Sequence, residues 1–485
     1  MRGAPLPLAR LYSLSAAATL FLAACGGGAA TPTAAPAAPA TTAPAKPTTA
    51  AAPAASPAAS PAAAPAASPA AKPAASPSAA PAAAASPSAA PAVAAAQFPA
   101  GTTIKIVSSL PRTGSNKGQT DTIVNSFKMA LDELGGTDGV GAKIGGATIV
   151  YQDLDDATAA KGSWDAAKEA ENANQALNDQ DVMAYIGTFN SGAAKVSIPI
   201  LCAQNLGMVS PANTYTGLTK NIPGAVEANE PDVYYPNCKR NYTRVVPSDE
   251  IQGAAGAAWS KTIGATKVYV LDDTQLYGHG IAVAYVAAAP KAGVQVVGGP
   301  EGIDDKASDY RALAQKIRQS GADMVYFGGI TQANAGKLWI DLRATLGNDI
   351  KLMGPDGIFE QAFIDAAGPA AEGTYVTFGG VPPSKLTGLG ATWYANYKKR
   401  FNSEPEAYAG YGYEAMKVTL NAIQTAGKKD RAAIRDAIFN TKNYSGALGT
   451  WSFTDTGDTT ITAMSGRQVK NGAFDDANSV TLAAP

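Results

Sequence analysis

Short apolar segments alternate with amphipathic segments along most of the chain after residue 100, and this alternation constrains the fold more than any other feature. Residues 103–107 have the length and apolar content of a strand. Residues 121–134 place Ile123, Phe127 and other apolar side chains at the 3.6-residue period of one helix face, and Gly135 follows where that helix should end. The same pattern predicts further strands at 148–152, 182–186, 208–209, 267–271, 294–297, 324–327 and 351–353, and further helices at 164–177, 192–204, 249–261, 278–292, 310–320 and 332–346.

Short strands separated by helices imply parallel sheets that are covered by helices on both faces. The series occurs twice, so we predict an α/β fold of two doubly wound parallel-sheet lobes. The rest of the chain is expected to be mainly helical and to end in short strands near residues 450–453 and 466–470. Ligands of such folds bind at the carboxyl ends of strands, where loops lead into helices.

The composition divides the 485 residues into two unlike parts. The first 97 residues are mostly Ala, Pro, Ser and Thr, with four of the 38 Lys and Arg residues and none of the 39 acids. The remaining 388 residues have a net charge near −5 and are numerous enough for two lobes. An acidic body argues against nucleic-acid binding. One histidine and three cysteines argue against zinc sites and catalytic triads, so we expect no metal and no cofactor.

The first 24 residues are typical of a targeting signal. Arg2 and Arg10 precede an apolar stretch at 11–24, which is too short for the roughly 20 residues that span a bilayer. Leu-Ala-Ala-Cys at 22–25, followed by three glycines, resembles the bacterial lipobox. We therefore predict a lipoprotein signal peptide at 1–24 and a lipidated Cys25. A general secretory signal with an incidental cysteine is the alternative.

Residues 25–97 are expected to form a disordered Ala/Pro/Ser tether behind the lipidated cysteine. Frequent prolines remove helix donors, and the composition offers nothing to bury in a core. At roughly 3 Å per residue such a tether reaches at most about 200 Å. It would hold the folded body away from a membrane.

Familiar catalytic motifs are missing from the sequence. Gly336-Lys337 is followed by Leu338 and does not complete a P-loop, and the chain has neither a dinucleotide-binding glycine motif nor a nucleophile elbow. His279, at a predicted helix start, could contact a ligand, but a surface position is the simpler interpretation. We therefore predict that the protein is not an enzyme.

Cys202 and Cys238 are the two remaining cysteines, 36 positions apart. In an exported protein they are expected to form a disulfide that closes the irregular stretch between them. Two separate cysteines, with Cys202 packed on its helix, are the alternative.

Three loops that follow predicted strands carry polar groups. Residues 187–193 include Ser191, residues 210–214 end in Asn213 and Thr214, and residues 354–357 include Asp356. Hydroxyls and free backbone N–H groups suit a carboxylate, and an aspartate suits an ammonium. Each residue also has a purely structural explanation, as a helix cap or a turn residue. Together the loops predict a clamp for a zwitterion.

Several blocks resemble the type I periplasmic solute-binding proteins, in particular the leucine/isoleucine/valine-binding receptors of ABC transporters. The resemblance extends over residues 103–472 with the blocks in order. They are AYIGTFNSGAAKVSIPILCAQNLGMVSPANTYTGLT (184–219), RVVPSDEIQGAA (244–255), VYVLDDTQLYGHGIA (268–282), DYRALAQKIRQSGADMVYFGG (309–329) and LMGPDGI (352–358).

The resemblance implies a two-lobed clamshell joined by three chain crossings. The expected crossings lie near Pro247, near Phe378 and Gly379, and near residues 448–451. Lobe 1 would comprise residues 98–247 and 379–448, and lobe 2 would comprise residues 248–378 and 449–485.

The resemblance also implies the residues that hold the ligand. The carboxylate of an amino acid would be held by Ser191 and by the loop with Ala212, Asn213 and Thr214. The ammonium would meet Asp356, with Tyr277 beside it.

Three positions depart from the family pattern. Lys117 stands where an aromatic or small residue is usual, Ile330 replaces a frequent aromatic, and Asp356 is shorter than the usual glutamate. These departures argue against a plain branched-chain amino acid, and Lys117 would favour a ligand with an additional acidic group.

The implied function is that of an exported solute-binding lipoprotein of an ABC importer. It would be anchored by its lipid to the outer face of the cytoplasmic membrane and act as a monomer that delivers an amino acid, an amide or a carboxylate to permease subunits. Two alternatives remain open: a ligand sensor that works without transport, and an exported hydrolase.

Overall fold

The computed structural model describes residues 97–483. The predicted signal peptide at 1–24, the predicted lipidation at Cys25 and the tether up to residue 96 lie outside the described residues.

The first sheet has six strands, in the order β2-β3-β1-β6-β7-β8. All neighbours are parallel except β2 and β3. Residue pattern and structure agree for β1, since its inward side chains Ile104 and Ile106 are fully buried. The strands are β1 (Thr103–Leu110), β2 (Lys143–Ile144), β3 (Ala147–Asp155), β6 (Val182–Gly187), β7 (Gly207–Ser210) and β8 (Tyr242–Arg244).

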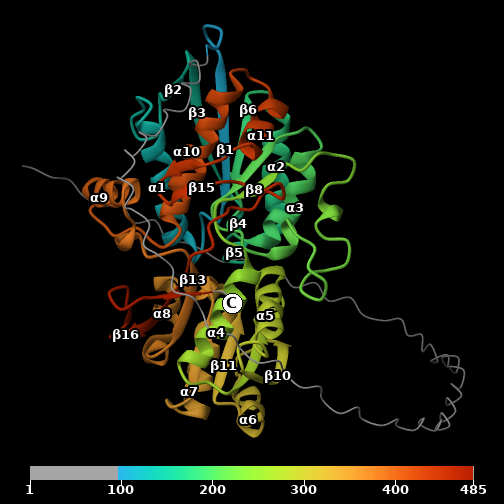
Figure 1. Ribbon diagram of the computed structural model, residues 1–485, viewed down its shortest axis with the longest axis vertical. Helices are drawn as coiled ribbons and strands as arrows, with labels where there is room; N and C mark the ends of the chain where they lie inside the picture. Colours follow the sequence, from blue (N-terminus) through green and yellow to red (C-terminus); the bar gives the residue numbers. More distant parts are fainter. Residues whose placement is uncertain (1–96, 484–485) are drawn as a thin grey trace, which may run out of the picture. The chain divides into compact units, whose positions relative to one another are not determined.

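Helices cover both faces of this sheet (Figure 1). On one face α1 (Lys117–Asp132) packs against α10 (Ala409–Ala426), which packs against α11 (Arg431–Phe439). On the other face α2 (Ala166–Asn178) packs against α3 (Ser191–Cys202). Two helices therefore come from a part of the chain about 300 residues beyond β1.

The second sheet has the order β10-β9-β11-β12-β13-β16-β17, with β18 also paired to β16. Its first five strands are parallel, and β16 runs antiparallel to β13. The strands are β9 (Lys267–Asp272), β10 (Gln295–Gly302), β11 (Met324–Gly328), β12 (Lys351–Gly354), β13 (Tyr375–Gly379), β16 (Met464–Lys470), β17 (Ala473–Phe474) and β18 (Val480–Leu482).

The second sheet is also covered on both faces, which confirms the predicted fold class (Figure 1). Helices α4 and α5 pack together on one face, and α6, α7 and α8 form a layer on the other. These helices are α4 (Asp249–Thr262), α5 (Leu276–Ala288), α6 (Arg311–Gln319), α7 (Gly336–Leu346) and α8 (Gln361–Ala367). The remaining elements are α9 (Leu389–Phe401) and two small hairpins, β4 (Ala157–Thr158) with β5 (Ser163–Trp164), and β14 (Tyr444–Gly446) with β15 (Gly449–Trp451).

The chain passes between the two sheets after β8, after β13 and before β16. Pro247 and Gly379 lie at the first two passages, where a Cβ on Gly379 would be 3.2 Å from the Pro247 ring. The amide of Gly380 donates to the carbonyl of Ala463 at 2.7 Å, so the third passage lies beside the second.

The last passage differs from the prediction of a crossing near residues 448–451 and of a second lobe that begins at 449. Trp451 belongs to the β14–β15 hairpin, and its indole N–H donates to Glu414 of α10 at 2.6 Å. Asp458 pairs with Arg244 at the end of β8, with 2.7 Å between Oδ1 and Nε. These buried contacts hold residues 451–458 beside the first sheet, so the chain joins the second sheet only at Met464.

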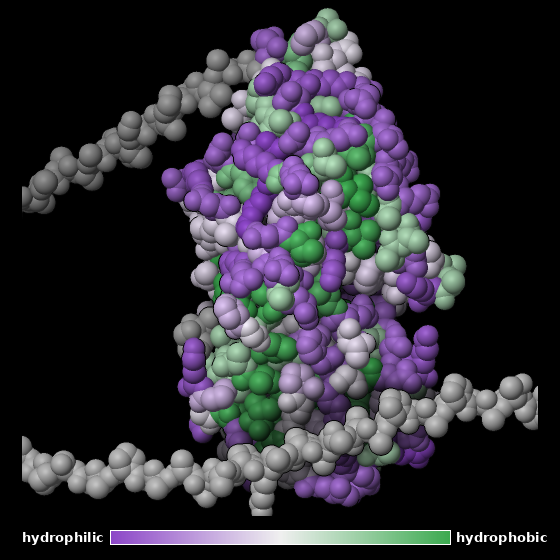
Figure 2. Space-filling model, turned by 90° about the vertical axis from the view of Figure 1, so that its right-hand side faces the viewer, coloured by the Kyte–Doolittle hydropathy of each residue, from purple (hydrophilic) through white to green (hydrophobic). Residues whose placement is uncertain are grey.

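The surface combines polar and apolar residues. Figure 2 shows hydrophilic residues over much of one face, with smaller apolar areas between them. Strongly exposed apolar side chains such as Val140, Val233 and Leu389 come from separate segments. Within residues 97–483 no helix has the length and apolar character needed to cross a bilayer.

Candidate functional site

A cavity with an empty volume of about 350 Å³ lies among loops that follow strands of both sheets. The first sheet contributes the loops after β6 and β7, and the second contributes those after β9, β11 and β12. The cavity is lined by Gln119, Phe189, Asn190, Ser191, Ala212, Thr214, Tyr277, Ile330, Asp356, Gly357 and Tyr408.

Two residues with hydroxyl groups, Ser191 and Thr214, form the polar wall of the cavity on the side of the first sheet. Ser191 is the first residue of α3, and its Oγ accepts a hydrogen bond from the backbone N–H of Tyr215 at 3.3 Å. Ser210 Oγ accepts from the N–H groups of Ala212 at 3.1 Å and Asn213 at 2.8 Å, which fixes the turn that leads to Thr214. A helix N-terminus beside hydroxyl groups favours an anionic group.

Asp356 forms the opposite polar wall. The hydroxyl of Tyr277 in α5 donates to Asp356 Oδ1 at 2.8 Å, and the hydroxyl of Tyr408 donates to Oδ2. The amide of Gly357 donates to the Tyr277 oxygen at 3.0 Å. Burial raises the pKa of Asp356, and the hydrogen bonds from Tyr408 and Tyr277 oppose that rise. The aspartate is thus held in one orientation as an acceptor for a cationic group.

The remaining wall is largely apolar and aromatic. Ile330 follows β11, and the rings of Phe189 and Tyr408 pack edge to face with 5.5 Å between their centroids. Gln119 closes this side, and its side-chain amide donates to the carbonyl of Phe359 at 3.3 Å. Asp356 is the one charged residue in this lining among residues 97–483.

Six of the predicted ligand residues line this cavity, and two do not. Asn213 is buried, but its amide donates to the Phe189 carbonyl at 2.9 Å and its Oδ1 accepts from Tyr242 at 3.3 Å, so it stabilises the loops. Lys117 is at the start of α1, where its ammonium lies 2.5 Å from Asp121 and its side chain is 57% exposed. The six are Ser191, Ala212, Thr214, Tyr277, Ile330 and Asp356.

The cavity lining also contains three residues that were not predicted to contact the ligand, Tyr408, Gln119 and Phe189. Phe189 lies inside the loop at 187–193, which was predicted to contact the ligand, but only Ser191 of that loop was named as a ligand residue. Tyr408 stands directly before α10, in the part of the chain expected to be mainly helical, and nothing in the sequence connects it to Asp356, which lies 52 residues earlier. Only the packing of α10 against the first sheet places it there.

The histidine and the two cysteines in the described part of the chain lie outside the cavity lining. His279 is 54% exposed, and its Nδ1 is 3.0 Å from Asp272. Cys202 and Cys238 form a disulfide. Within the described part of the chain no group of three or more His, Cys, Asp or Glu residues is arranged to hold a metal ion.

Side chains from the two sheets touch across the cleft. The indole N–H of Trp164 donates to Gln275 at 3.2 Å, and the amide of Gln332 donates to Ser115 at 3.0 Å. Tyr215, after β7, packs on Gly280 of α5, where a Cβ would be 2.4 Å from ring carbons. The structure therefore shows the two halves in contact.

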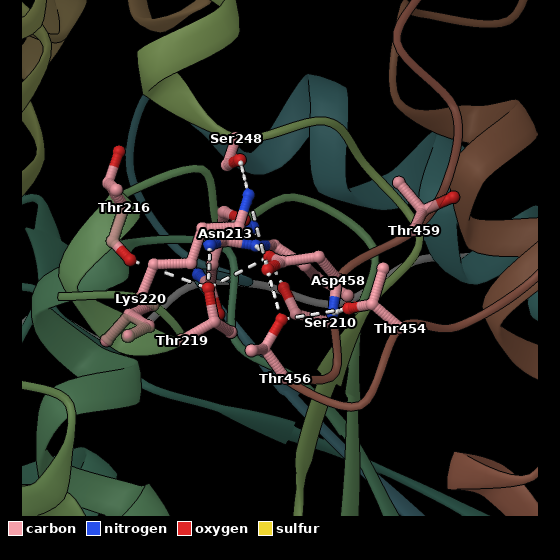
Figure 3. A network of polar contacts seen from close by, with 12 residues as sticks. Ser210, Asn213, Thr216, Thr219, Lys220, Ser248, Thr454, Thr456, Asp458 and Thr459 are labelled. Carbon is pink, nitrogen blue, oxygen red and sulfur yellow. Dashed lines mark hydrogen bonds and ion pairs between the residues drawn. The ribbon is translucent and has the colours of Figure 1, made fainter. Parts of the chain in front are cut away.

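A buried polar network adjoins the cavity and the first passage between the sheets (Figure 3). Arg244 bonds to Asp458 at 2.7 Å and to the Tyr215 carbonyl at 2.8 Å. Lys220 donates to Ser248 at 3.2 Å and lies 3.4 Å from Asp458. Burial opposes ionisation of Asp458, but the charges of Arg244 and Lys220 outweigh it and lower the pKa of that carboxyl to about 2.

Comparisons with known proteins agree with the two-sheet fold. The family model described as periplasmic binding protein matches residues 103–473. A Leu/Ile/Val-binding protein homolog from Brucella abortus is 28% identical over 359 residues, which are 72% of this chain and 86% of the relative.

Two solved structures extend the comparison. A leucine-binding protein from Thermotoga maritima has a TM-score of 0.67 at 25% identity, with 79% of this chain and 99% of that chain covered. A solute-binding protein of an R. palustris ABC transporter, in complex with benzoate, has a TM-score of 0.63 at 18% identity, with 79% and 97% covered. Because the family match covers most of the described residues and the two-sheet fold agrees with it, the chain belongs to the periplasmic binding protein family of solute-binding receptors.

Proposed function

We propose that the protein is the extracytoplasmic solute-binding lipoprotein of an ABC importer, and that it captures an amino acid or a similar zwitterion and delivers it to the permease. The observation that carries this proposal is the cavity itself. It has a buried aspartate on one side and two hydroxyls, one at a helix N-terminus, on the other. This arrangement is complementary to a small molecule with one cationic and one anionic end.

In the proposed complex the ammonium bonds to Asp356, and the carboxylate bonds to Ser191 and Thr214. The ligand side chain would lie against Phe189 and Ile330. Lys117 is paired with Asp121 outside this lining, so we no longer propose an additional acidic group on the ligand. The relatives that are named for leucine, isoleucine and valine support an amino acid, whereas the benzoate complex shows that this fold also accommodates an aromatic carboxylate.

Capture would be coupled to closure of the two halves. A ligand that bonds to both walls interacts more strongly with the closed form, and it shifts the population by that difference in affinity. The contacts of Tyr215 with Gly280 and of Trp164 with Gln275 already join the halves in the described structure. The closed form would then be the one that docks on the permease.

Attachment to the membrane is also part of the proposal. The lipobox-like Cys25 and the Ala/Pro-rich residues that follow support a lipid anchor with a spacer. One acyl chain anchors only marginally, so stable attachment requires more than one.

Replacing Gly280 by Ala should weaken closure. The new Cβ would overlap the ring of Tyr215, whose hydroxyl is fixed by a 2.6 Å bond to Glu230. We expect solute affinity to fall about tenfold, which corresponds to roughly 1.4 kcal/mol, because the closed form becomes less favourable. Titration calorimetry measures the affinity, and small-angle scattering measures the closure.

The matched control for this change is Gly118→Ala in α1, where a Cβ has open space around it. This variant should bind like the wild type. Wild-type affinity and closure in Gly280→Ala would show that the Tyr215 contact does not limit closure.

A thermal-shift screen tests the proposed function. The purified full chain would be heated with each L-amino acid, with short amides and urea, and with small carboxylates. A bound solute at 100 times its dissociation constant stabilises the native state by about 2.7 kcal/mol, so an amino acid should raise the melting temperature clearly. If no amino acid does so while a carboxylate or an amide does, that class replaces the amino acid in the proposal.

A further inference from the structure

Asp249 is a second buried acid beside the solute cavity. It is the first residue of α4, immediately after the first passage between the sheets, and it is fully buried. Its backbone N–H donates to the carbonyl of Thr214 at 2.9 Å, which ties it to a residue of the cavity wall. Neither of its carboxyl oxygens has a well-formed hydrogen bond within the described structure, although the hydroxyl of Thr214 and the charge of Arg244 partly oppose the effect of burial on its pKa.

Charged and titratable groups face Asp249 from several elements. They are Asp356 after β12, Arg244 and Tyr242 of β8, Glu250 of α4, Tyr277 of α5, Tyr326 of β11 and Tyr408 before α10. Arg244, the one cation of this set, is already bound to Asp458 and to backbone carbonyls. Glu250 is paired with Lys220, so Asp249 and Asp356 are the acids of this set without an ion pair in the described structure.

Two buried carboxylates in one region are unfavourable when both are ionised, because each has lost its water and repels the other. Burial raises the pKa of Asp249 well above its ordinary range, and the charge of Asp356 adds to this rise. Asp356 differs because two tyrosine hydroxyls stabilise its ionised form. Asp249 is thus the member of the pair that retains a proton.

We propose that Asp249 is a charge-selecting residue of the solute site, which holds a proton in the ligand-free protein and releases it to solvent when an ammonium group binds Asp356. The ammonium cancels the charge of Asp356, so Asp249 can ionise. This inference rests on the proposed function and refines its ligand class. An uncharged amide or urea at Asp356 would bring no positive charge and would release no proton.

The proton on Asp249 can be tested without any ligand. Between the ordinary pKa of an aspartate, about 3.9, and the raised value, the native state binds one proton more than the unfolded state, so stability falls as pH rises. The folding equilibrium constant of the wild type should therefore fall by up to about tenfold per pH unit relative to Asp249→Asn. Denaturant titration of the full chain between pH 5 and 8 measures this difference.

Asp349→Asn, at an exposed position, is the matched control and should follow the wild type at every pH. Parallel curves for the wild type and Asp249→Asn would overturn the proposal, because Asp249 would then hold no proton in this range.

Proton release is measured by calorimetry with L-leucine in phosphate and in Tris, which differ in ionisation enthalpy. The wild type and Asp349→Asn should release up to one proton per bound leucine, and the wild-type affinity should rise by up to about tenfold per pH unit in the window of release. Asp249→Asn should release none. Leucine binding by the wild type without proton release would overturn the proposal. This measurement uses the wild-type protein alone, so it does not depend on whether a variant folds. If leucine does not bind at all, the proposed ligand is wrong, whereas the ligand-free titration still decides whether Asp249 holds a proton.

Discussion

Arg244→Met is expected to lower the free energy of unfolding by about 3–5 kcal/mol. The Arg244 side chain is fully buried and its guanidinium bonds to Asp458, to the hydroxyl of Thr219 and to the carbonyls of Asn213 and Tyr215. The variant would leave Asp458 buried beside the more distant Lys220 (Figure 3). Denaturant unfolding at pH 7 measures the loss.

Two further variants distinguish the loss of the buried ion pair from a general effect of removing a positive charge. Arg318→Met removes an exposed cation of α6 and should change the free energy of unfolding by less than about 0.5 kcal/mol. Adding Asp458→Asn to Arg244→Met should recover part of the loss, since no unpaired charge remains buried. Equal stability of Arg244→Met and Arg318→Met would show that the network contributes nothing.

The contribution of Asp458 has a defined pH dependence. Its pKa is lowered to about 2 in the native state, below the ordinary value of about 3.9. A group with a depressed pKa stabilises the native state above the unfolded-state value, and the stabilisation is lost as pH falls through the native-state value. The difference between the wild type and Arg244→Met should therefore be complete above about pH 5 and shrink towards pH 2.

Ser191→Ala combined with Asp356→Ala is expected to abolish solute binding. Each change removes a hydrogen bond to a charged end of the proposed ligand, and such bonds contribute about 1.5–3 kcal/mol each. The combined loss corresponds to a decrease in affinity of at least about 100-fold. Calorimetry with the solute that gives the largest thermal shift measures it.

Asp349→Ala is the matched control, since it removes an exposed aspartate that does not line the cavity. It should bind like the wild type. Unchanged affinity in the double variant would place the solute site elsewhere in the protein.

The sequence pattern was sufficient to predict the fold class, because each sheet is built mainly from apolar strands that alternate with helices. Several strands were not predicted, and two of them, β8 and β13, directly precede passages between the sheets. Tyr242–Arg244 is only three residues long and ends in a buried arginine whose charge is balanced by the distant Asp458. Tyr375–Gly379 follows α8, a helix of seven residues that was not predicted either, so the alternation of strand and helix could not be followed this far in the sequence.

The site was predictable where chain order and strand ends define it. Ser191, Thr214 and Asp356 each follow a strand, and the parallel arrangement brings such loops to one edge. Lys117 was predicted to contact the ligand, but Asp121 four residues later is a local partner for it on the same helix face. Tyr408 could not be predicted, because its position depends on how a distant helix packs.

The central claim is that the cavity recognises both ends of a zwitterion, and calorimetric titration with matched analogues tests it most directly. The wild-type full chain would be titrated with L-leucine, with 4-methylpentanoate, which lacks the ammonium, and with 3-methylbutylamine, which lacks the carboxylate. The account predicts one leucine bound per chain and at least about 100-fold weaker binding of both analogues. If 4-methylpentanoate binds as tightly as leucine, Asp356 does not select an ammonium group and the account is contradicted.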